Sequence, residues 1–263
     1  MALIDVTVHA ASLGFRTRIS VAFPTSYRNL LPEGAPFYIP PKPAPDKILY
    51  LLHGLSDDAG AWVRNTRIET YAEDRGYIVI MPEVQRSFYT DMKHGSQYFH
   101  YLTDELPKLC EEMFNIKHTR ERTFIAGLSM GGYGALKAGL SRPDFYSACA
   151  GFSGALDVSR RLFHLQPREA YREIGALYGD ATEAPDHADV YKLATKMATL
   201  PSAEQSRVLV TCGEQDFLLD DNRKMAELLK TLPIDHAYEE WPGVHDWPFW
   251  DESIVRAFDF FER

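Results

Sequence analysis

The sequence predicts an α/β fold in which helices cover both faces of a mostly parallel central sheet. Short runs of large apolar residues recur along the chain, as in strands that are buried on both faces of a parallel sheet. Segments with helical periodicity lie between these runs, and this alternation is typical of parallel sheets. The first two segments differ, because their apolar and polar residues alternate as in strands with one solvent-facing side.

The chain begins with a predicted antiparallel hairpin. Residues 3–9 (LIDVTVH) and 15–23 (FRTRISVAF) both alternate, and the short turn ASLG separates them. Two alternating runs joined by a short turn that contains glycine are typical of a hairpin. We therefore expect the parallel part of the sheet to begin after this N-terminal hairpin.

The remaining elements follow in order, each apolar run being followed by a periodic segment. The predicted strands are 47–54, 77–83, 123–129, 146–153, 207–214 and 237–243, and the predicted helices are 58–73, 97–115, 130–141, 219–231 and 248–262. Residues 155–206 contain no clear strand, so we expect a small, cap-like helical insertion there. The whole chain, 1–263, is predicted to form a single domain, because α/β folds of this length often do.

The composition excludes several classes of protein. Asp and Glu number 37 against 28 Lys and Arg, and this net charge of −9 argues against a nucleic-acid or anionic-membrane partner. The three cysteines do not make a disulfide framework. No apolar run approaches the ~20 residues of a membrane span, and the first residues lack the features of a signal peptide. We expect a cytoplasmic protein, and homo-oligomer formation stays open.

The segment Gly127-Leu128-Ser129-Met130-Gly131 matches the G-x-S-x-G motif of a nucleophilic serine. It follows a predicted strand and opens a predicted helix, which is the context that makes the motif meaningful. The serine must occupy a sharp, strained turn, so its neighbours must be small. Ser129 is therefore the predicted nucleophile.

The acid and base of such a site follow the serine in the order Asp or Glu, then His. Asp216 lies in the loop after strand 207–214, whereas Asp220 and Asp221 are expected in the first turn of the next helix, where carboxylates suit the helix dipole. Of the nine histidines, His245 alone follows the last predicted strand. We predict that Asp216 orients His245, and that His245 takes the proton of the serine.

Two backbone N–H groups are expected to bind the oxyanion. One belongs to Met130, at the start of the helix, and the other to the loop after strand 47–54, where Leu55 is the natural candidate. Gly54 permits the turn of that loop, and His53 is expected to have a structural role.

Three aromatic residues are expected near the mouth of the site, namely Trp62, Tyr89 and Trp247. They are candidate walls of a substrate pocket, since such pockets are mostly apolar. Ordinary core packing is the alternative. We predict no metal and no cofactor, because the chain has neither an H-x-x-x-H nor a paired-cysteine spacing.

The chain resembles the tributyrin esterase group within the esterase D and S-formylglutathione hydrolase branch of the α/β-hydrolases. The resemblance spans roughly residues 50–255. The matching stretches are LLHGLSDDAGAW (51–62), TFIAGLSMGGYGALKAG (123–139), GFSGAL (151–156), CGEQDFLLDDN (212–222) and GVHDWPFWD (243–251). The resemblance implies an α/β-hydrolase fold with a Ser129–Asp216–His245 triad and with Leu55 and Met130 as oxyanion donors.

The resemblance implies a serine carboxylesterase that hydrolyses short-chain acyl esters. Four alternatives stay open: a carbohydrate acetyl or feruloyl-type esterase, an S-formylglutathione hydrolase, an acyltransferase, and a non-catalytic binding module. S-formylglutathione hydrolases carry a cysteine-containing G-L-T-C-type loop, whereas this chain reads H-G-L-S. Within the insertion, one predicted helical face is expected to dock on the domain and leave no lipase-like lid. Its residues are Ala170, Tyr171, Ile174, Leu177 and Tyr178.

Overall fold

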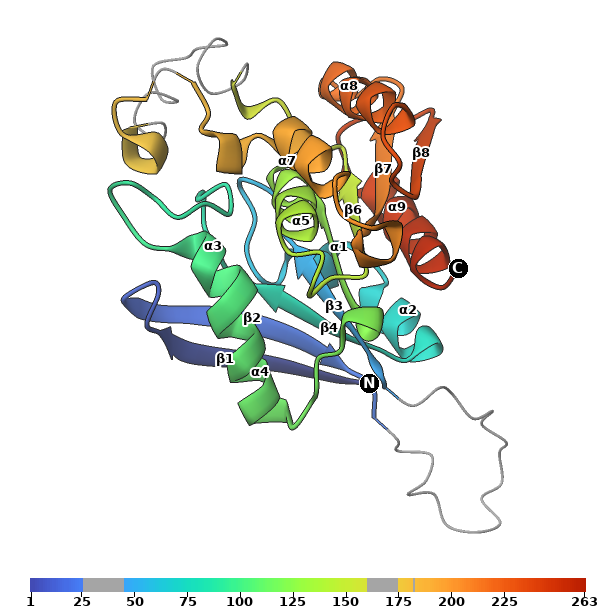
Figure 1. Ribbon diagram of the computed structural model, residues 1–263. Helices are drawn as coiled ribbons and strands as arrows, with labels where there is room; N and C mark the ends of the chain where they lie inside the picture. Colours follow the sequence, from blue (N-terminus) through green and yellow to red (C-terminus); the bar gives the residue numbers. More distant parts are fainter. Residues whose placement is uncertain (26–44, 160–174, 182) are drawn as a thin grey trace.

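The computed structural model describes residues 1–25, 45–159, 175–181 and 183–263, and these contain an eight-stranded sheet. Across the sheet the strands run in the order β1-β2-β4-β3-β5-β6-β7-β8 (Figure 1). Their bounds are β1 Ala2–Ala10, β2 Phe15–Phe23, β3 Lys47–Leu52, β4 Tyr77–Pro82, β5 Thr123–Leu128, β6 Ala148–Phe152, β7 Arg207–Gly213 and β8 His236–Trp241.

The strand pairing confirms the two kinds of segment read from the sequence. β1 and β2 form an antiparallel hairpin, and β2 also pairs antiparallel with β4. The pairs from β4 through β3, β5, β6 and β7 to β8 are all parallel. The carboxyl ends of these six strands therefore lie at one edge of the sheet, where α/β enzymes bind their ligands.

Helices connect the strands in the expected alternation. The α-helices are α1 Ala61–Asn65, α2 Ile68–Arg75, α3 Tyr98–His100, α4 Leu106–Phe114, α5 Met130–Ser141, α7 Val190–Met197, α8 Leu219–Lys230 and α9 Trp247–Phe261. The short elements are the π turn η2 Tyr101–Glu105 and the 3₁₀ turns η3 Arg120–Arg122, η5 Asp186–Ala188 and η6 Ser202–Glu204. All helices in the described ranges are too short or too polar to span a bilayer.

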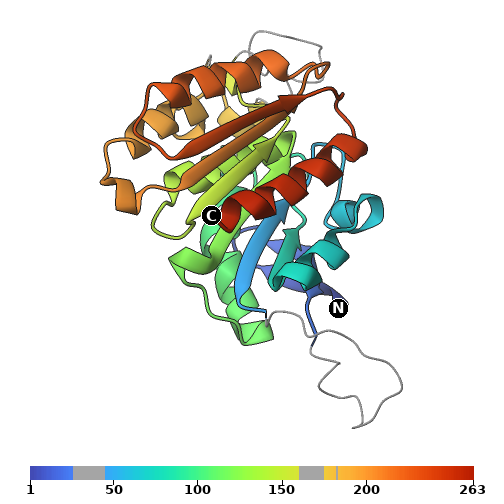
Figure 2. The same cartoon turned by 90° about the vertical axis from the view of Figure 1, so that its right-hand side faces the viewer.

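Each face of the sheet has its own apolar core. On one face α1, α2 and α9 pack against strand residues such as Leu49, Val79 and Phe124. On the other face α4, α5, α7 and α8 pack against the alternate residues, such as Tyr50 and Ile125. Figure 2 shows α9 crossing the first face together with α1 and α2. The period-2 alternation of strand side chains thus separates the two cores.

The predicted helix 58–73 is in fact two helices, α1 and α2. Thr66 adopts an extended backbone at the end of α1, and its hydroxyl donates to the carbonyl of Trp62 at 2.6 Å. The same hydroxyl accepts a hydrogen bond from the N–H of Ile68, the first residue of α2. A threonine side chain that competes for backbone groups therefore ends one helix and begins the next.

The predicted helix 97–115 contains the π turn η2 between α3 and α4. Pro107 lies in the first turn of α4 and has no N–H to donate to the preceding turn. The carbonyl of Thr103, four residues earlier, instead accepts a hydrogen bond from Arg142 Nη1 at 3.4 Å. The wider π turn accommodates the proline, so that α3, η2 and α4 follow one another without interruption.

The described part of the insertion 155–206 is helical, as expected, and contains η5, α7 and η6. Leu177 and Tyr178 are buried in the core on the α5 side of the sheet. The other members of the predicted docking face, Ala170, Tyr171 and Ile174, lie outside the described residues.

Candidate active site

Ser129 occupies the turn between β5 and α5 in a strained conformation. Its φ is 54° and its ψ is −116°, values that residues other than glycine rarely adopt. Its N–H donates to the carbonyl of Phe152 on β6 at 2.9 Å, and its own carbonyl accepts from the N–H groups of Tyr133 and Ala155. The neighbouring strand and the first turn of α5 therefore hold the turn in this conformation.

The glycines around Ser129 are required by close backbone contacts. A Cβ atom on Gly131 would lie 2.5 Å from the carbonyl oxygen of Leu52 at the end of β3. A Cβ atom on Gly127 would lie 2.4 Å from the carbonyl oxygen of Gly131. These contacts bring the start of α5 directly against the end of β3, where the loop with Leu55 begins.

The two predicted oxyanion donors follow neighbouring parallel strands. Leu52 of β3 pairs with Gly127 of β5, so Leu55 and Met130 both come just after carboxyl ends at the same edge of the sheet. Met130 is the first residue of α5, and the first N–H groups of a helix have no partner within the helix. They are therefore free to bind a negative charge.

His53 is buried and holds the loop that carries Leu55. Its Nδ1 lies 2.7 Å from the carbonyl oxygen of Gly54, and its Nε2 accepts the N–H of Val84 at 3.1 Å. Tyr89 donates its hydroxyl to the His53 carbonyl at 2.9 Å. The predicted structural role of His53 agrees with these contacts, because both ring nitrogens are used to fix the backbone.

Asp216 and His245 meet at the same edge of the sheet, beyond the ends of β7 and β8. His245 Nδ1 lies 2.8 Å from Asp216 Oδ2, and Asp216 Oδ1 accepts the N–H of Leu218 at 2.8 Å. The Asp216 side chain is fully buried, whereas that of His245 is 18% exposed. A buried carboxylate on Nδ1 fixes the ring tautomer and leaves Nε2 as the reactive nitrogen.

The surroundings keep Asp216 ionised. Burial raises the pKa of its carboxyl, but hydrogen bonds from the His245 ring and the Leu218 N–H outweigh burial and hold this pKa below its ordinary value. The Ser153 hydroxyl contributes in the same direction. The charge needed to stabilise an imidazolium is therefore present at neutral pH.

The structure joins Asp216 to His245 but does not extend the chain of hydrogen bonds to the serine. Within the described ranges no hydrogen bond links the Ser129 hydroxyl to His245. Such catalytic bonds are often long without substrate and tighten in the complex. Trp250 links the two sides, since its ring contacts His245 at 4.9 Å and its Nε1 donates to Ser153 Oγ, next to Phe152.

The other candidate acids have different roles. Asp220 and Asp221 lie in the first turn of α8, as predicted. Asp221 is buried and its Oδ2 accepts the N–H of Asp157 at 3.3 Å, so its carboxylate supports the insertion. Asn222, in the next position, clamps the N–H and carbonyl of Gly154 beside Ser129, a contact that sequence reasoning missed.

The aromatic candidates for the pocket wall differ from the prediction. Trp62 lies in α1, is fully buried, and donates its Nε1 to the Leu52 carbonyl at 3.0 Å. Tyr89 is also fully buried, with its ring against Gly134. Trp247 is half-buried as the first residue of α9, and its ring contacts Trp62 edge-on. Trp62 and Tyr89 are therefore core residues, as in the alternative interpretation, because neither side chain has surface left for a ligand.

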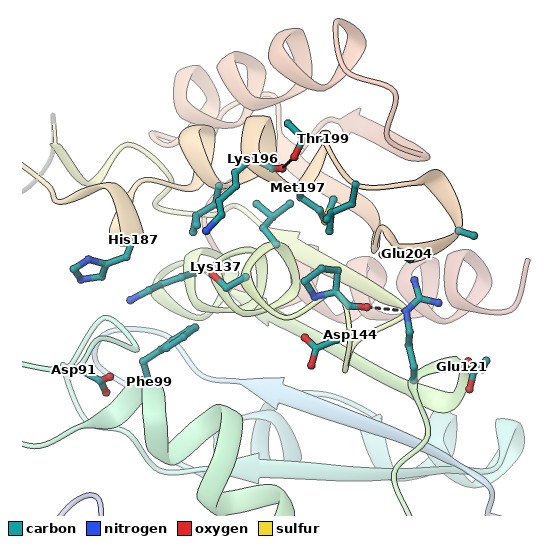
Figure 3. Close-up of a pocket in the computed structure, with 17 residues that line it drawn as sticks. Asp91, Phe99, Glu121, Lys137, Asp144, His187, Lys196, Met197, Thr199 and Glu204 are labelled. Carbon is teal, nitrogen blue, oxygen red and sulfur yellow. Dashed lines mark hydrogen bonds between the residues drawn. The ribbon is translucent and has the colours of Figure 1, made fainter.

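A large cavity lies elsewhere, between α5 and α7. Its volume is about 950 Å³, and none of Ser129, Asp216 and His245 lines it. Figure 3 shows Lys137 of α5 at one end of it, close to His187 and Phe99. Lys137 is buried and donates to the Tyr89 carbonyl at 3.0 Å and to Thr90 Oγ1 at 2.8 Å. Burial lowers the pKa of its ammonium group to about 7.

A metal centre or a thiol nucleophile would be another kind of catalytic site in the described residues. The described ranges hold no group of three or more His, Cys, Asp or Glu side chains arranged to bind a metal ion. Cys110, Cys149 and Cys212 are free and buried. Burial raises the pKa of Cys110 and of Cys149 to about 12, so both stay protonated at neutral pH.

Comparison with known proteins identifies the family. A family model described as "Putative esterase" matches residues 18–261, nearly the whole chain. The chain belongs to this esterase family. Its relatives include the acetyl esterase of Caldicellulosiruptor saccharolyticus, which is 33% identical over 227 residues, 82% of this chain and 84% of that protein.

Solved structures of two Staphylococcus aureus proteins are similar to this esterase. The fluorophosphonate-binding serine hydrolase FphF is 30% identical with a TM-score of 0.85, covering 100% of this chain and 98% of that one. The S-formylglutathione hydrolase FrmB is 30% identical with a TM-score of 0.82, covering 100% and 99%. The protein is thus a carboxylic ester hydrolase with an α/β-hydrolase fold, in the esterase D and S-formylglutathione hydrolase branch.

Proposed function

We propose that this esterase hydrolyses short-chain acyl esters through an acyl-enzyme formed on Ser129. The observation that carries the proposal is the hydrogen bond between His245 Nδ1 and the buried Asp216 carboxylate, at the sheet edge where Ser129 stands on its strained turn. These groups have the chemistry of a nucleophile, a base and an orienting acid.

In the first half of the proposed reaction, the Ser129 hydroxyl oxygen attacks the ester carbonyl and His245 Nε2 takes the hydroxyl proton. The resulting imidazolium is stabilised by Asp216, whose lowered pKa keeps it ionised. The oxyanion binds to the N–H groups of Leu55 and Met130. The tetrahedral intermediate then collapses, the alcohol leaves with the proton of His245, and the acyl group stays on Ser129.

In the second half, water attacks the acyl-enzyme. His245 takes a proton from the water, and the second tetrahedral intermediate uses the same two N–H donors. Its collapse releases the carboxylic acid and returns the proton to Ser129. The cycle needs no metal or cofactor, because the oxyanion and the protons are all handled by groups of the chain.

The proposed short acyl group is supported by the insertion. Leu177 and Tyr178 belong to its predicted docking face, and both are buried against the domain. Apolar side chains that are used for docking cannot also cover a long acyl chain. The similarity to an acetyl esterase points in the same direction.

Thioester hydrolysis is a second candidate, because FrmB is 30% identical over essentially the whole length of both chains. The ratio of kcat/KM for S-formylglutathione to that for p-nitrophenyl acetate separates the two candidates. We expect the oxygen ester to be preferred. A preference for the thioester would assign the chain to the second candidate.

Covalent labelling tests the proposed nucleophile. A fluorophosphonate probe should modify Ser129, identified by mass spectrometry of the labelled peptide, and Ser129→Ala should lower kcat by at least ~10³ with folding kept. Ser202→Ala, at an exposed position in η6, is the matched control and should keep both labelling and activity. Substantial activity in the Ser129 variant would contradict the proposal.

A further inference from the structure

Two exposed apolar side chains flank the Asp216–His245 pair. Phe217 directly follows Asp216 and is 68% exposed, and Val244 directly precedes His245 and is 48% exposed. The described ranges contain five exposed large apolar side chains, and Phe217 and Val244 are the two most exposed of them. Single exposed apolar residues are ordinary, but these two directly adjoin, in the chain, the two members of a candidate acid–base pair.

The ring of Phe217 lies directly against the imidazole of His245. The two ring centroids are 4.5 Å apart with an angle of 52° between the planes. Trp250 contacts the same imidazole edge-on at 4.9 Å but is buried, 5% exposed. Trp250 therefore supports the ring from the core, whereas Phe217 retains aromatic surface that faces solvent beside it.

The position of a leaving alcohol is tied to His245 by the proposed chemistry. The imidazolium gives its proton to the alcohol oxygen, so that oxygen must come within hydrogen-bond distance of Nε2. The substituent on the alcohol then lies beside whatever surrounds the exposed edge of the ring. We propose that Phe217 and Val244 form a binding subsite for an apolar alcohol moiety, an inference that rests on the proposed function.

The side chains of Gln215 and Asp216, next to this subsite, already have hydrogen-bond partners. Gln215 Oε1 accepts the N–H of Gly243 at 2.9 Å, and Gln215 Nε2 donates to Glu214 Oε2 at 3.4 Å. Asp216 Oδ2 accepts a hydrogen bond from His245, and Asp216 Oδ1 accepts one from the N–H of Leu218. A sugar alcohol brings several hydroxyls, and the side chains of Phe217 and Val244 offer no hydrogen-bond partner for them. An arylalkyl or aliphatic alcohol fits this surface better.

Acetates of three primary alcohols test the subsite at constant acyl group: ethyl acetate, 3-phenylpropyl acetate and a methyl glucoside acetylated at O6. We expect kcat/KM for the phenylpropyl ester to exceed that for the ethyl ester on the order of tenfold, a ratio typical of one aromatic contact plus apolar burial. Phe217→Ala should bring the ratio close to one, because it should lower kcat/KM for the phenylpropyl ester more than for the ethyl ester. Phe217→Leu should keep part of the preference, because it keeps apolar surface.

Met113→Ala is the matched control, since Met113 is an exposed apolar residue on α4, 38% exposed. It should leave all three rates unchanged. An equal loss for ethyl and phenylpropyl acetate in Phe217→Ala would overturn the inference, because Phe217 would then act only on His245. An unchanged ratio, or a loss confined to the sugar acetate, would overturn it as well.

The failure of this subsite is distinguishable from failure of the proposed function. Each preparation is also labelled with the fluorophosphonate probe, and Phe217→Ala should still be labelled at Ser129. Retained ethyl acetate hydrolysis in Ser129→Ala would reject the nucleophile, whatever Phe217 does. Normal labelling at Ser129 with an unchanged alcohol preference in Phe217→Ala would reject the subsite alone.

Discussion

His245 Nδ1 lies 2.8 Å from Asp216 Oδ2, although 28 residues separate the two in the chain and they follow different strands. The parallel pairing of β7 with β8 explains the contact, because it places the loops after both strands at one edge. Asp216 is buried there with its second oxygen on the N–H of Leu218. The carboxylate is therefore fixed, and the imidazole is oriented by it.

Replacing the acid should show which aspartate orients the base. We expect Asp216→Asn to lower kcat on the order of 10⁴ with folding kept, because an amide favours the wrong tautomer of His245. Asp220→Asn, at an exposed position in the first turn of α8, is the control and should change kcat less than about twofold. Steady-state kinetics on p-nitrophenyl acetate measure both. A larger loss in the Asp220 variant would contradict the assignment.

The glycine contact between α5 and β3 gives a prediction about stability. Gly131→Ala should lower the free energy of unfolding by about 1–3 kcal/mol, because its methyl group would lie 2.5 Å from the Leu52 carbonyl oxygen and force a shift. Gly175→Ala is the matched control, since a Cβ there meets nothing within 4 Å. Urea unfolding followed by circular dichroism measures both. Equal stabilities for the two variants would contradict this account of the turn.

Lys137 gives a prediction about the pH dependence of stability. Its pKa is lowered to about 7 by burial, whereas a lysine in an unfolded chain has a pKa of about 10.4. Between these values the unfolded chain binds more protons than the folded chain, so the Lys137 contribution makes the folded state more stable as pH rises. The stability of the natural chain relative to Lys137→Met should therefore increase from about pH 7 to about pH 10.

Urea unfolding at both pH values provides the measurement. Lys196→Met is the control, because Lys196 lines the same cavity but is exposed on α7. The stability of this variant should change with pH in parallel with that of the natural chain. If Lys137→Met also runs parallel to the natural chain, the buried ammonium is not the source of the pH dependence.

The strands and the helix order could be predicted because each buried strand has a distinct apolar run and a helical segment follows each of them along the chain. The positions of Asp216 and His245 followed from that regularity, since both stand just beyond a strand end. The π turn before Pro107 and the break at Thr66 were missed. The break depends on one hydrogen bond of the Thr66 side chain, and the π turn lies where Pro107 has no backbone N–H to donate. The periodicity of apolar residues carries no information about such local hydrogen bonds.

Side-chain direction was harder to predict than backbone position. Tyr89 was expected near the site mouth, but its neighbours turn the ring inward against Gly134. Lys137 offered a signal that could have been used, since residues 130–140 contain no other charged residue and every one of them is buried. A helix that is apolar all round is buried, so a lysine within it must be buried too.

The acyl specificity gives the last prediction. A closed pocket gains roughly 0.8 kcal/mol for each methylene that fits, and the first one that does not fit costs about 1–3 kcal/mol. The rate should therefore rise to a maximum at two to about four acyl carbons and then fall sharply. This shape follows if Leu177 and Tyr178, which are buried against the domain, leave the insertion without an apolar face for long chains. Values of kcat/KM for p-nitrophenyl esters from acetate to palmitate measure it. A maximum at eight carbons or more, or activation at an oil interface, would refute the short-acyl specificity while leaving the Ser129 chemistry intact.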